Sequence, residues 1–234
     1  MIDHEQMFVF VQIPKTGGTS IADLLSHNPM PRGWDVVAKK YRQHFTIPEL
    51  IENTCLTTEQ SDFYFKFAFV RNPWDKAVSE YMNHFRIYCS DFEHYVSKVK
   101  VIVEYLNENF TFDLESPFYE NYSRITFNAL HNEDLDSPFK PWPGEEVIID
   151  PHFFPQHLFT HDENGNLLVN TIGVFEDFDS NAVDILDHLG VAHSHIVKIN
   201  SSNRGTYQDM HTEKTKDIIA GIYDVDIKIF GYEF

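Results

Sequence analysis

The segment Pro14–Ser20, with the sequence Pro-Lys-Thr-Gly-Gly-Thr-Ser, combines one cationic side chain with two glycines and three hydroxyl groups. A continuously apolar run at 7–11 precedes it, and a helix-like segment follows it. Two adjacent glycines let the backbone come close to an anion, and the N–H groups of a first helical turn point toward that anion. Because Lys15 adds a full positive charge, the pattern predicts a cradle for a phosphate or sulfate group.

The order of residues in this segment differs from that of the nucleotide triphosphatases. Their loop reads G-x-x-x-x-G-K-[ST], so the lysine follows the glycines. Here Lys15 precedes Gly17 and Gly18. The match to that loop therefore fails, and the alternative without any ligand is an ordinary strand–turn–helix junction.

A second constellation begins at 65–70, a segment that is apolar except for Lys66 and that we expect to be a buried strand. Arg71 follows directly, then Asn72 as a plausible N-cap and Pro73 as a plausible first helical residue. Apolar residues then recur at helical spacing, which predicts a helix over 73–87. This arrangement places an arginine at the C-terminal end of a strand.

Arg71 and Ser79 are candidates for binding a second anionic group. Ligands of open α/β sheets bind outside the carboxyl ends of the strands. The planar guanidinium suits a phosphate dianion, and the Ser79 hydroxyl, about two turns into the predicted helix, offers another donor. The structural alternatives are a surface ion pair for Arg71 and a neutral helix position for Ser79.

Taken together, segments 14–20 and 71–79 resemble those of the sulfotransferases that use 3′-phosphoadenosine 5′-phosphosulfate (PAPS). The likeness is to the carbohydrate-type group (sulfotransferase family 2), which includes heparan and chondroitin sulfotransferases and bacterial relatives. Further elements similar to those of this group are His44, 152–156, 175–178 and the tail 223–234. The resemblance covers nearly the whole chain, and its two nucleotide motifs are specific as an ordered pair.

The resemblance implies that PAPS is the co-substrate. Sulfuryl transfer also has less need of a metal than phosphoryl transfer, since a sulfonate carries less charge than a phosphoryl group. The residues it assigns to the donor are Lys15, Thr16, Gly17, Gly18, Thr19, Ser20, Arg71 and Ser79. Lys15 is expected to act catalytically, because a cation at the leaving oxygen stabilises the charge that develops there. Arg71 and Ser79 are expected to anchor the 3′-phosphate and so to orient the reacting end.

The catalytic base is expected to be a histidine, because a neutral imidazole accepts protons near neutral pH. The resemblance places a histidine between the two nucleotide motifs, which makes His44 the first choice and His152 the second. With 13 histidines in the chain, a surface position is the alternative for His44. The predicted acceptor-binding residues are His152, Gln156 and Glu176, although Glu176 could instead only brace a loop.

Two histidine groups raise the question of a bound metal: 152, 157 and 161, and the pair at 193 and 195. A helical zinc site of the H-E-x-x-H type needs two histidines four residues apart with a glutamate between them. A proline interrupts the first group, and neither a cysteine nor a glutamate completes either set. We therefore expect no catalytic metal.

The length and composition fit a globular domain of ordinary size. The 234 residues are 42% hydrophobic, which argues against disorder and fits one domain over 1–234. Apolar runs that alternate with helical patterns predict an α/β fold. We expect a three-layer, P-loop-like fold in which helices flank a central, mostly parallel sheet. The loop-rich segment 111–165 is expected to be a lid that binds the acceptor, because long irregular stretches in compact domains are usually functional.

The net charge and the targeting signals limit the classes of partner that we expect for this chain. A net charge of −18 argues against nucleic acid and anionic membranes, and less firmly against a highly sulfated polysaccharide. Neither a signal peptide nor a long apolar span is evident, and two cysteines fit free thiols, so we expect a soluble, cytoplasmic protein. The acceptor is a hydroxyl compound, for which a sugar, a lipid headgroup and a small metabolite stay open. The sequence leaves the oligomeric state undetermined.

Two other functions compete with a sulfotransferase that acts on a carbohydrate. One is a P-loop-like kinase or nucleotide triphosphatase that acts on a small molecule. That activity would need a lysine after the glycines and an aspartate at a strand end for magnesium, and neither is evident. The other is a non-catalytic protein that only binds the nucleotide.

Overall fold

The computed structural model describes residues 1–25, 34–35, 40–109, 151–162, 164–192 and 205–234. The chain divides into two compact units, the first formed by 1–71 and 156–201 and the second by 72–155 and 202–234. A single domain over 1–234 stays a prediction.

The first unit is built on a four-stranded sheet in the order β1-β2-β5-β6. Its strands are β1 (Ile2–Asp3), β2 (Phe8–Val11), β5 (Phe65–Val70) and β6 (Thr171–Val174). Strand β1 is antiparallel to β2, whereas β2, β5 and β6 run parallel. The strand predicted at 65–70 is therefore confirmed, as is an α/β fold with a mostly parallel sheet. That the fold is P-loop-like stays a prediction.

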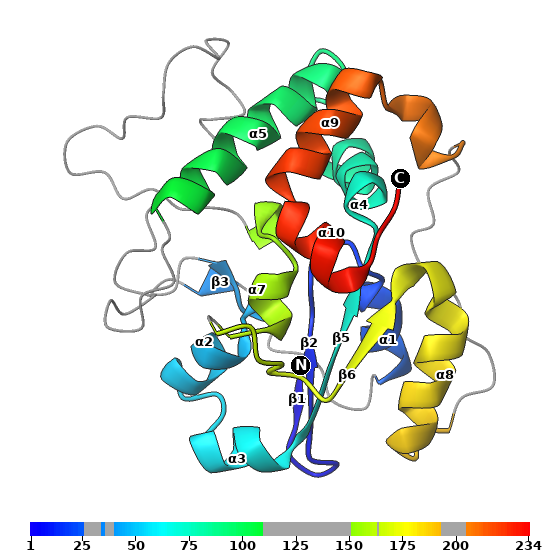
Figure 1. The fold of residues 1–234 in the computed structure, drawn as a ribbon. Helices are drawn as coiled ribbons and strands as arrows, with labels where there is room; N and C mark the ends of the chain where they lie inside the picture. The colour runs from blue at the N-terminus through cyan, green and yellow to red at the C-terminus, as the bar shows by residue number, and fades with distance from the viewer. Residues whose placement is uncertain (26–33, 36–39, 110–150, 163, 193–204) are drawn as a thin grey trace. The chain divides into compact units, whose positions relative to one another are not determined.

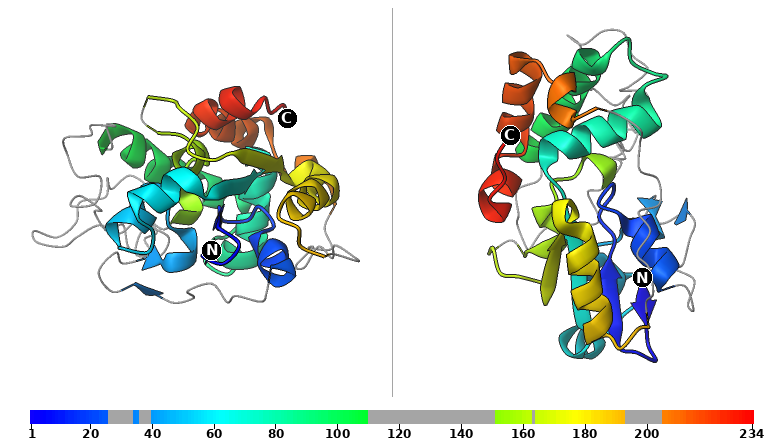
Figure 2. Two further views of the ribbon diagram at one scale, coloured as in Figure 1. Left: turned by 90° about the horizontal axis from the view of Figure 1, so that it is seen from below. Right: turned by 90° about the vertical axis from the view of Figure 1, so that its right-hand side faces the viewer.

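Helices lie on both sides of this sheet. Helices α1 (Gly18–Leu24) and α8 (Phe178–His188) lie on one side, and α2 (Ile47–Glu52) and α3 (Thr58–Phe63) lie on the other (Figures 1 and 2). The short elements of this unit are β3 (Trp34–Asp35), β4 (Lys40–Tyr41), two 3₁₀ turns at Arg42–His44 and Phe175–Asp177, and α7 (His157–Thr160).

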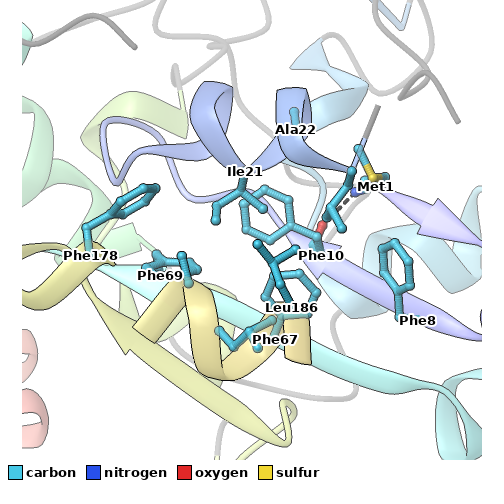
Figure 3. Close-up of a cluster of buried hydrophobic side chains, with 12 residues drawn as sticks. Met1, Phe8, Phe10, Ile21, Ala22, Phe67, Phe69, Phe178 and Leu186 are labelled. Carbon is cyan, nitrogen blue, oxygen red and sulfur yellow. Dashed lines mark hydrogen bonds between the residues drawn. The ribbon is translucent and has the colours of Figure 1, made fainter. Parts of the chain in front are cut away.

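Alternate residues of β2 and β5 carry the main core of the first unit. Phe8, Phe10, Phe67 and Phe69 point to the same face, because side chains alternate along a strand. They pack with the apolar residues of α1 and α8, among them Leu186 (Figure 3). Both faces of β2 and of 67–70 in β5 are buried, which explains why these stretches are continuously apolar rather than alternating.

The second unit is helical in the part that the structure describes. Its elements are α4 (Pro73–Glu80), a π-helical turn at Tyr81–Phe85, α5 (Phe92–Asn109), two 3₁₀ turns at Pro151–Phe153 and Tyr207–Met210, α9 (Glu213–Ile222) and α10 (Asp224–Phe230). Helix α9 contacts both α4 and α5. The side chain of Asn72 accepts from the N–H groups of Trp74 and Asp75, as expected of an N-cap. The helix predicted over 73–87 therefore begins as expected but widens into π geometry after Glu80.

The predicted lid lies mostly outside the described residues. Of the segment 111–165, the structure describes 151–162 and 164–165. The thiols of Cys55 and Cys89 are free, as expected. None of the described helices combines the length and apolar character that crossing a membrane requires.

His211 gives the second unit a predictable response to acid. Its Nε2 lies 3.2 Å from the carbonyl oxygen of Trp74, and its ring packs edge-on against Phe92 and Phe234. Burial lowers the pKa of His211, although the Trp74 carbonyl and the charge of Asp75 oppose the shift. Below the ordinary histidine value of about 6.5 the unfolded chain therefore binds the proton first, and the free energy of unfolding falls as pH falls.

We expect His211→Gln to lose less stability than the native chain between about pH 7 and pH 5, because the variant has no imidazole to protonate at this position. Urea unfolding of both proteins at the two pH values gives the comparison. The difference between the two losses isolates His211 from the other histidines. Equal losses would contradict the prediction.

Candidate active site

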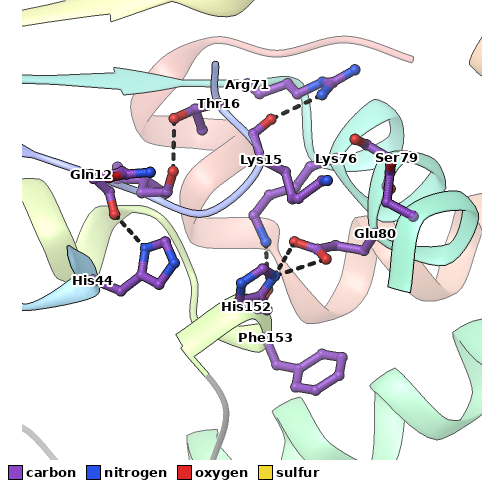
Figure 4. Close-up of polar contacts among 12 residues, drawn as sticks. Gln12, Lys15, Thr16, His44, Arg71, Lys76, Ser79, Glu80, His152 and Phe153 are labelled. Atoms are coloured by element: carbon purple, nitrogen blue, oxygen red, sulfur yellow. Dashed lines mark hydrogen bonds and ion pairs between the residues drawn. The ribbon is translucent and has the colours of Figure 1, made fainter. Parts of the chain in front are cut away.

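The loop between β2 and α1 has an unusual backbone. Lys15 has φ +65° and Gly17 has φ +85°, so two residues of one short loop are left-handed. A residue with a side chain adopts this conformation rarely, and such strain is concentrated at functional sites. The Thr16 hydroxyl donates to the carbonyl of Ile13 at 2.9 Å, which ties the loop to the end of the strand (Figure 4). Successive N–H groups in such a loop form a concave anion site.

The two glycines of this loop are required by close packing. A Cβ on Gly17 would overlap the ring of Phe178, and a Cβ on Gly18 would lie 2.5 Å from Cγ of Gln12. The carbonyl of Gly17 accepts from Ser20 and Ile21 and so starts α1. The N–H groups before Ser20 precede the first intrahelical bond.

Arg71 joins the second motif to the first within the same unit. Its Nη1 donates to the main-chain carbonyl of Lys15 at 2.9 Å (Figure 4). Its guanidinium carbon lies 4.0 Å from the centre of the Phe175 ring, so the planar group is held between an aromatic face and the loop. The structure thus brings together two segments that are 56 residues apart in sequence.

Gln156 fixes the backbone of Arg71. Its Oε1 accepts from the Arg71 N–H at 2.8 Å, and its Nε2 donates to the Arg71 carbonyl at 2.7 Å. The side chain is buried, with 1% of its surface exposed. The geometry gives Gln156 a bracing role, and a direct contact with the acceptor stays a prediction. Glu176 is exposed on the 3₁₀ turn after β6, next to Phe175.

His44 lies on the same unit and is 4% exposed. Its Nδ1 is 2.9 Å from the main-chain carbonyl of Gln12 (Figure 4). A carbonyl only accepts hydrogen bonds, so the neutral ring carries its proton on Nδ1 and leaves Nε2 as the basic atom. The side-chain nitrogen of Gln43 lies 3.2 Å from that Nε2.

The second unit carries the other two predicted site residues. Ser79 is buried in α4, and its carbonyl accepts from the side chain of Asn83 at 2.8 Å. His152 places Nδ1 2.9 Å from both carboxylate oxygens of Glu80, whose surface is 1% exposed (Figure 4). Ser79 and His152 therefore belong to a different compact unit from Lys15, Arg71 and His44.

The model of the sulfotransferase family matches residues 1–233, essentially the whole chain. The chain belongs to the sulfotransferase family. No curated protein and no solved structure matches it at a significant level. The match includes both the loop at Lys15 and the strand end at Arg71.

Sequence reasoning missed Gln12 of this sulfotransferase. Among the described residues, its Oε1 is a buried side-chain oxygen for which the protein offers no hydrogen-bond partner. The amide lies against Gly18, and the main-chain carbonyl of the same residue orients His44. An amide can present either its oxygen or its nitrogen, so it suits a polar group of a bound ligand. The signal in the sequence was a polar residue that interrupts the apolar run just before the loop.

We expect Gly17→Ala to destabilise the sulfotransferase by at least about 1–3 kcal/mol, because alanine at positive φ is strained and its methyl group would displace Phe178 from the core. Gly221→Ala is the matched control. Gly221 lies in α9 with nothing near its missing Cβ, so alanine there should stabilise by up to about 1 kcal/mol. Urea unfolding measures both. A Gly17→Ala protein as stable as the native chain would rule out the close packing.

Proposed function

We propose that this protein transfers the sulfuryl group of PAPS to a hydroxyl group of an acceptor, with a carbohydrate as the favoured class. The observation that carries the proposal is the hydrogen bond from the Arg71 guanidinium to the carbonyl of Lys15. It joins the strained anion loop to a buried arginine within one unit, which is what a nucleotide with phosphate groups at two positions requires. Family membership supports the transferase class.

The residues of the first unit fit the donor chemically. The concave loop offers backbone N–H groups to the 5′-phosphosulfate, and the glycines keep the approach open. Arg71 offers a planar, permanently charged fork for the 3′-phosphate, and Ser79 is proposed as a further donor to it. In a chain of net charge −18, these local cations decide where an anionic ligand is bound.

Lys15 and His44 are proposed to act on the reacting atoms. The acceptor hydroxyl oxygen forms a bond to sulfur while the bond between sulfur and the bridging phosphate oxygen breaks, and adenosine 3′,5′-bisphosphate leaves. The Lys15 ammonium stabilises the negative charge that develops on the bridging oxygen. The hydroxyl proton passes to Nε2 of His44, which the hydrogen bond at Nδ1 leaves unprotonated. His152, Gln156 and Glu176 are proposed to position the acceptor.

A ligand screen followed by a transfer assay tests this function. Adenosine 3′,5′-bisphosphate at about 100 times its Kd should stabilise the native state by about 2.7 kcal/mol, which raises the Tm. ATP with magnesium should give the smaller shift. A shift with ATP and magnesium alone would favour a kinase or triphosphatase.

Transfer of labelled sulfate from PAPS to a panel of sugars, lipid headgroups and small hydroxyl compounds then separates an enzyme from a protein that only binds the nucleotide. We expect a labelled product with at least one sugar. Tight binding of adenosine 3′,5′-bisphosphate without transfer to any compound would overturn the catalytic part of the proposal.

A further inference from the structure

In the second unit, three side chains of the kind that bind metals lie together: Glu80, His84 and His152. One potential ligand atom of each lies within 4.8 Å of those of the other two. The rings of His84 and His152 meet edge to face, with their centres 5.1 Å apart. The carboxylate is buried, whereas His84 is exposed, so the group opens to solvent on one side.

Two features of the backbone bring Glu80 and His84 together. They are four residues apart, a spacing that places side chains on the same face of a helix. The helix also changes to π geometry just after Glu80, with a hydrogen bond from the Arg86 N–H to the Tyr81 carbonyl at 2.8 Å. Such π turns are frequent at functional sites.

Hydrogen bonds to two successive main-chain carbonyls fix the position of His152. The Lys76 amine donates to the His152 carbonyl at 2.6 Å, and the Tyr223 hydroxyl donates to the carbonyl of Phe153 at 3.1 Å. The Phe153 ring packs against Phe85 with centres 5.3 Å apart. These contacts orient the imidazole toward Glu80 (Figure 4). A site held in this way needs little rearrangement to bind an ion.

We propose that Glu80, His84 and His152 bind a divalent transition-metal ion of the Zn²⁺ class. Two imidazole nitrogens and one carboxylate oxygen form a ligand set that suits Zn²⁺ or Co²⁺ better than Mg²⁺ or Ca²⁺, which prefer oxygen ligands. Three protein ligands leave the fourth tetrahedral position to water. The proton on Nδ1 of His152, which now faces Glu80, would be released to solvent if that atom binds the ion. The inference shares His152 with the residues proposed to position the acceptor, but its test does not require sulfuryl transfer.

Titration of the chelator-treated full chain tests the site. We expect the native protein to bind one Zn²⁺ that His84→Ala does not bind, or binds at least about tenfold more weakly, because loss of even an outer hydrogen bond at a metal site costs about 10- to 100-fold. His84 is exposed, so its replacement should leave the fold intact. His188→Ala, which removes another exposed histidine on α8, is the matched control and should bind as the native protein does.

Co²⁺ gives a second readout that nonspecific binding to other histidines would not reproduce. The native protein and His188→Ala should develop the visible absorption of tetrahedral Co²⁺, and His84→Ala and Glu80→Gln should not. Mg²⁺ should not compete. If His84→Ala matches the native protein in both Zn²⁺ stoichiometry and the Co²⁺ spectrum, there is no metal site here and the three residues form only a hydrogen-bonded group.

Discussion

Lys15→Ala is expected to lower the turnover of sulfuryl transfer by about 100- to 1000-fold while leaving the fold intact. The reason is that Lys15 is proposed to supply the cation at the leaving oxygen, and removal of one preorganised group that stabilises developing charge typically costs this much. Its side chain is only partly buried, so truncation leaves no cavity in the core. Steady-state rates at saturating PAPS measure the effect, with far-UV circular dichroism to confirm folding.

Lys214→Ala is the control for Lys15→Ala. Lys214 is an exposed lysine of α9 that forms an ion pair with Glu93 at 2.7 Å, and exposed pairs contribute little to stability. Its loss should leave turnover unchanged. A native rate in Lys15→Ala would show that the catalytic role proposed for Lys15 is wrong, even if the nucleotide still bound.

Arg71→Ala is expected to weaken the binding of adenosine 3′,5′-bisphosphate by about 10- to 150-fold, because a hydrogen bond to a charged group contributes about 1.5–3 kcal/mol. The change should also lower the Tm. Arg71 is buried, it packs on Phe175, and its removal leaves the Lys15 carbonyl without this donor. Calorimetric titration with the nucleotide and thermal unfolding measure the two effects separately.

Arg71→Lys separates charge from geometry at this position. A lysine keeps the positive charge but loses the planar fork and the stacking on Phe175. We therefore expect binding between that of the native chain and that of Arg71→Ala. Native affinity in both variants would show that the 3′-phosphate is held elsewhere.

Local sequence signals predicted the elements that carry the site. The run at 65–70, the Asn72 cap with Pro73 and the glycine pair at 17–18 can each be recognised within a few consecutive residues. The π turn after Glu80 was not predictable in this way. Apolar residues keep their helical spacing through this turn, so only the structure reveals where the backbone changes to π geometry.

The histidines show the limit of such reasoning most clearly. The sequence groups His152 with His157 and His161, because they are close along the chain. In the structure His152 pairs with Glu80, from which it is separated by 72 residues, while His157 and His161 belong to the other compact unit. A Glu-x-x-x-His spacing on a helix is common and predicts no ligand by itself, so the cluster with His84 could not have been expected.

The chain by itself determined the glycine-containing loop, the arginine at the strand end and the family, because these depend on residue types in a fixed order. Tertiary structure decided which groups meet: the Arg71 guanidinium with the Lys15 carbonyl, His44 with Gln12, and His152 with Glu80. The physical reason is that hydrogen bonds between segments dozens of residues apart form only once the sheet and helices have brought their ends together. Local sequence patterns therefore do not predict which distant segments come into contact.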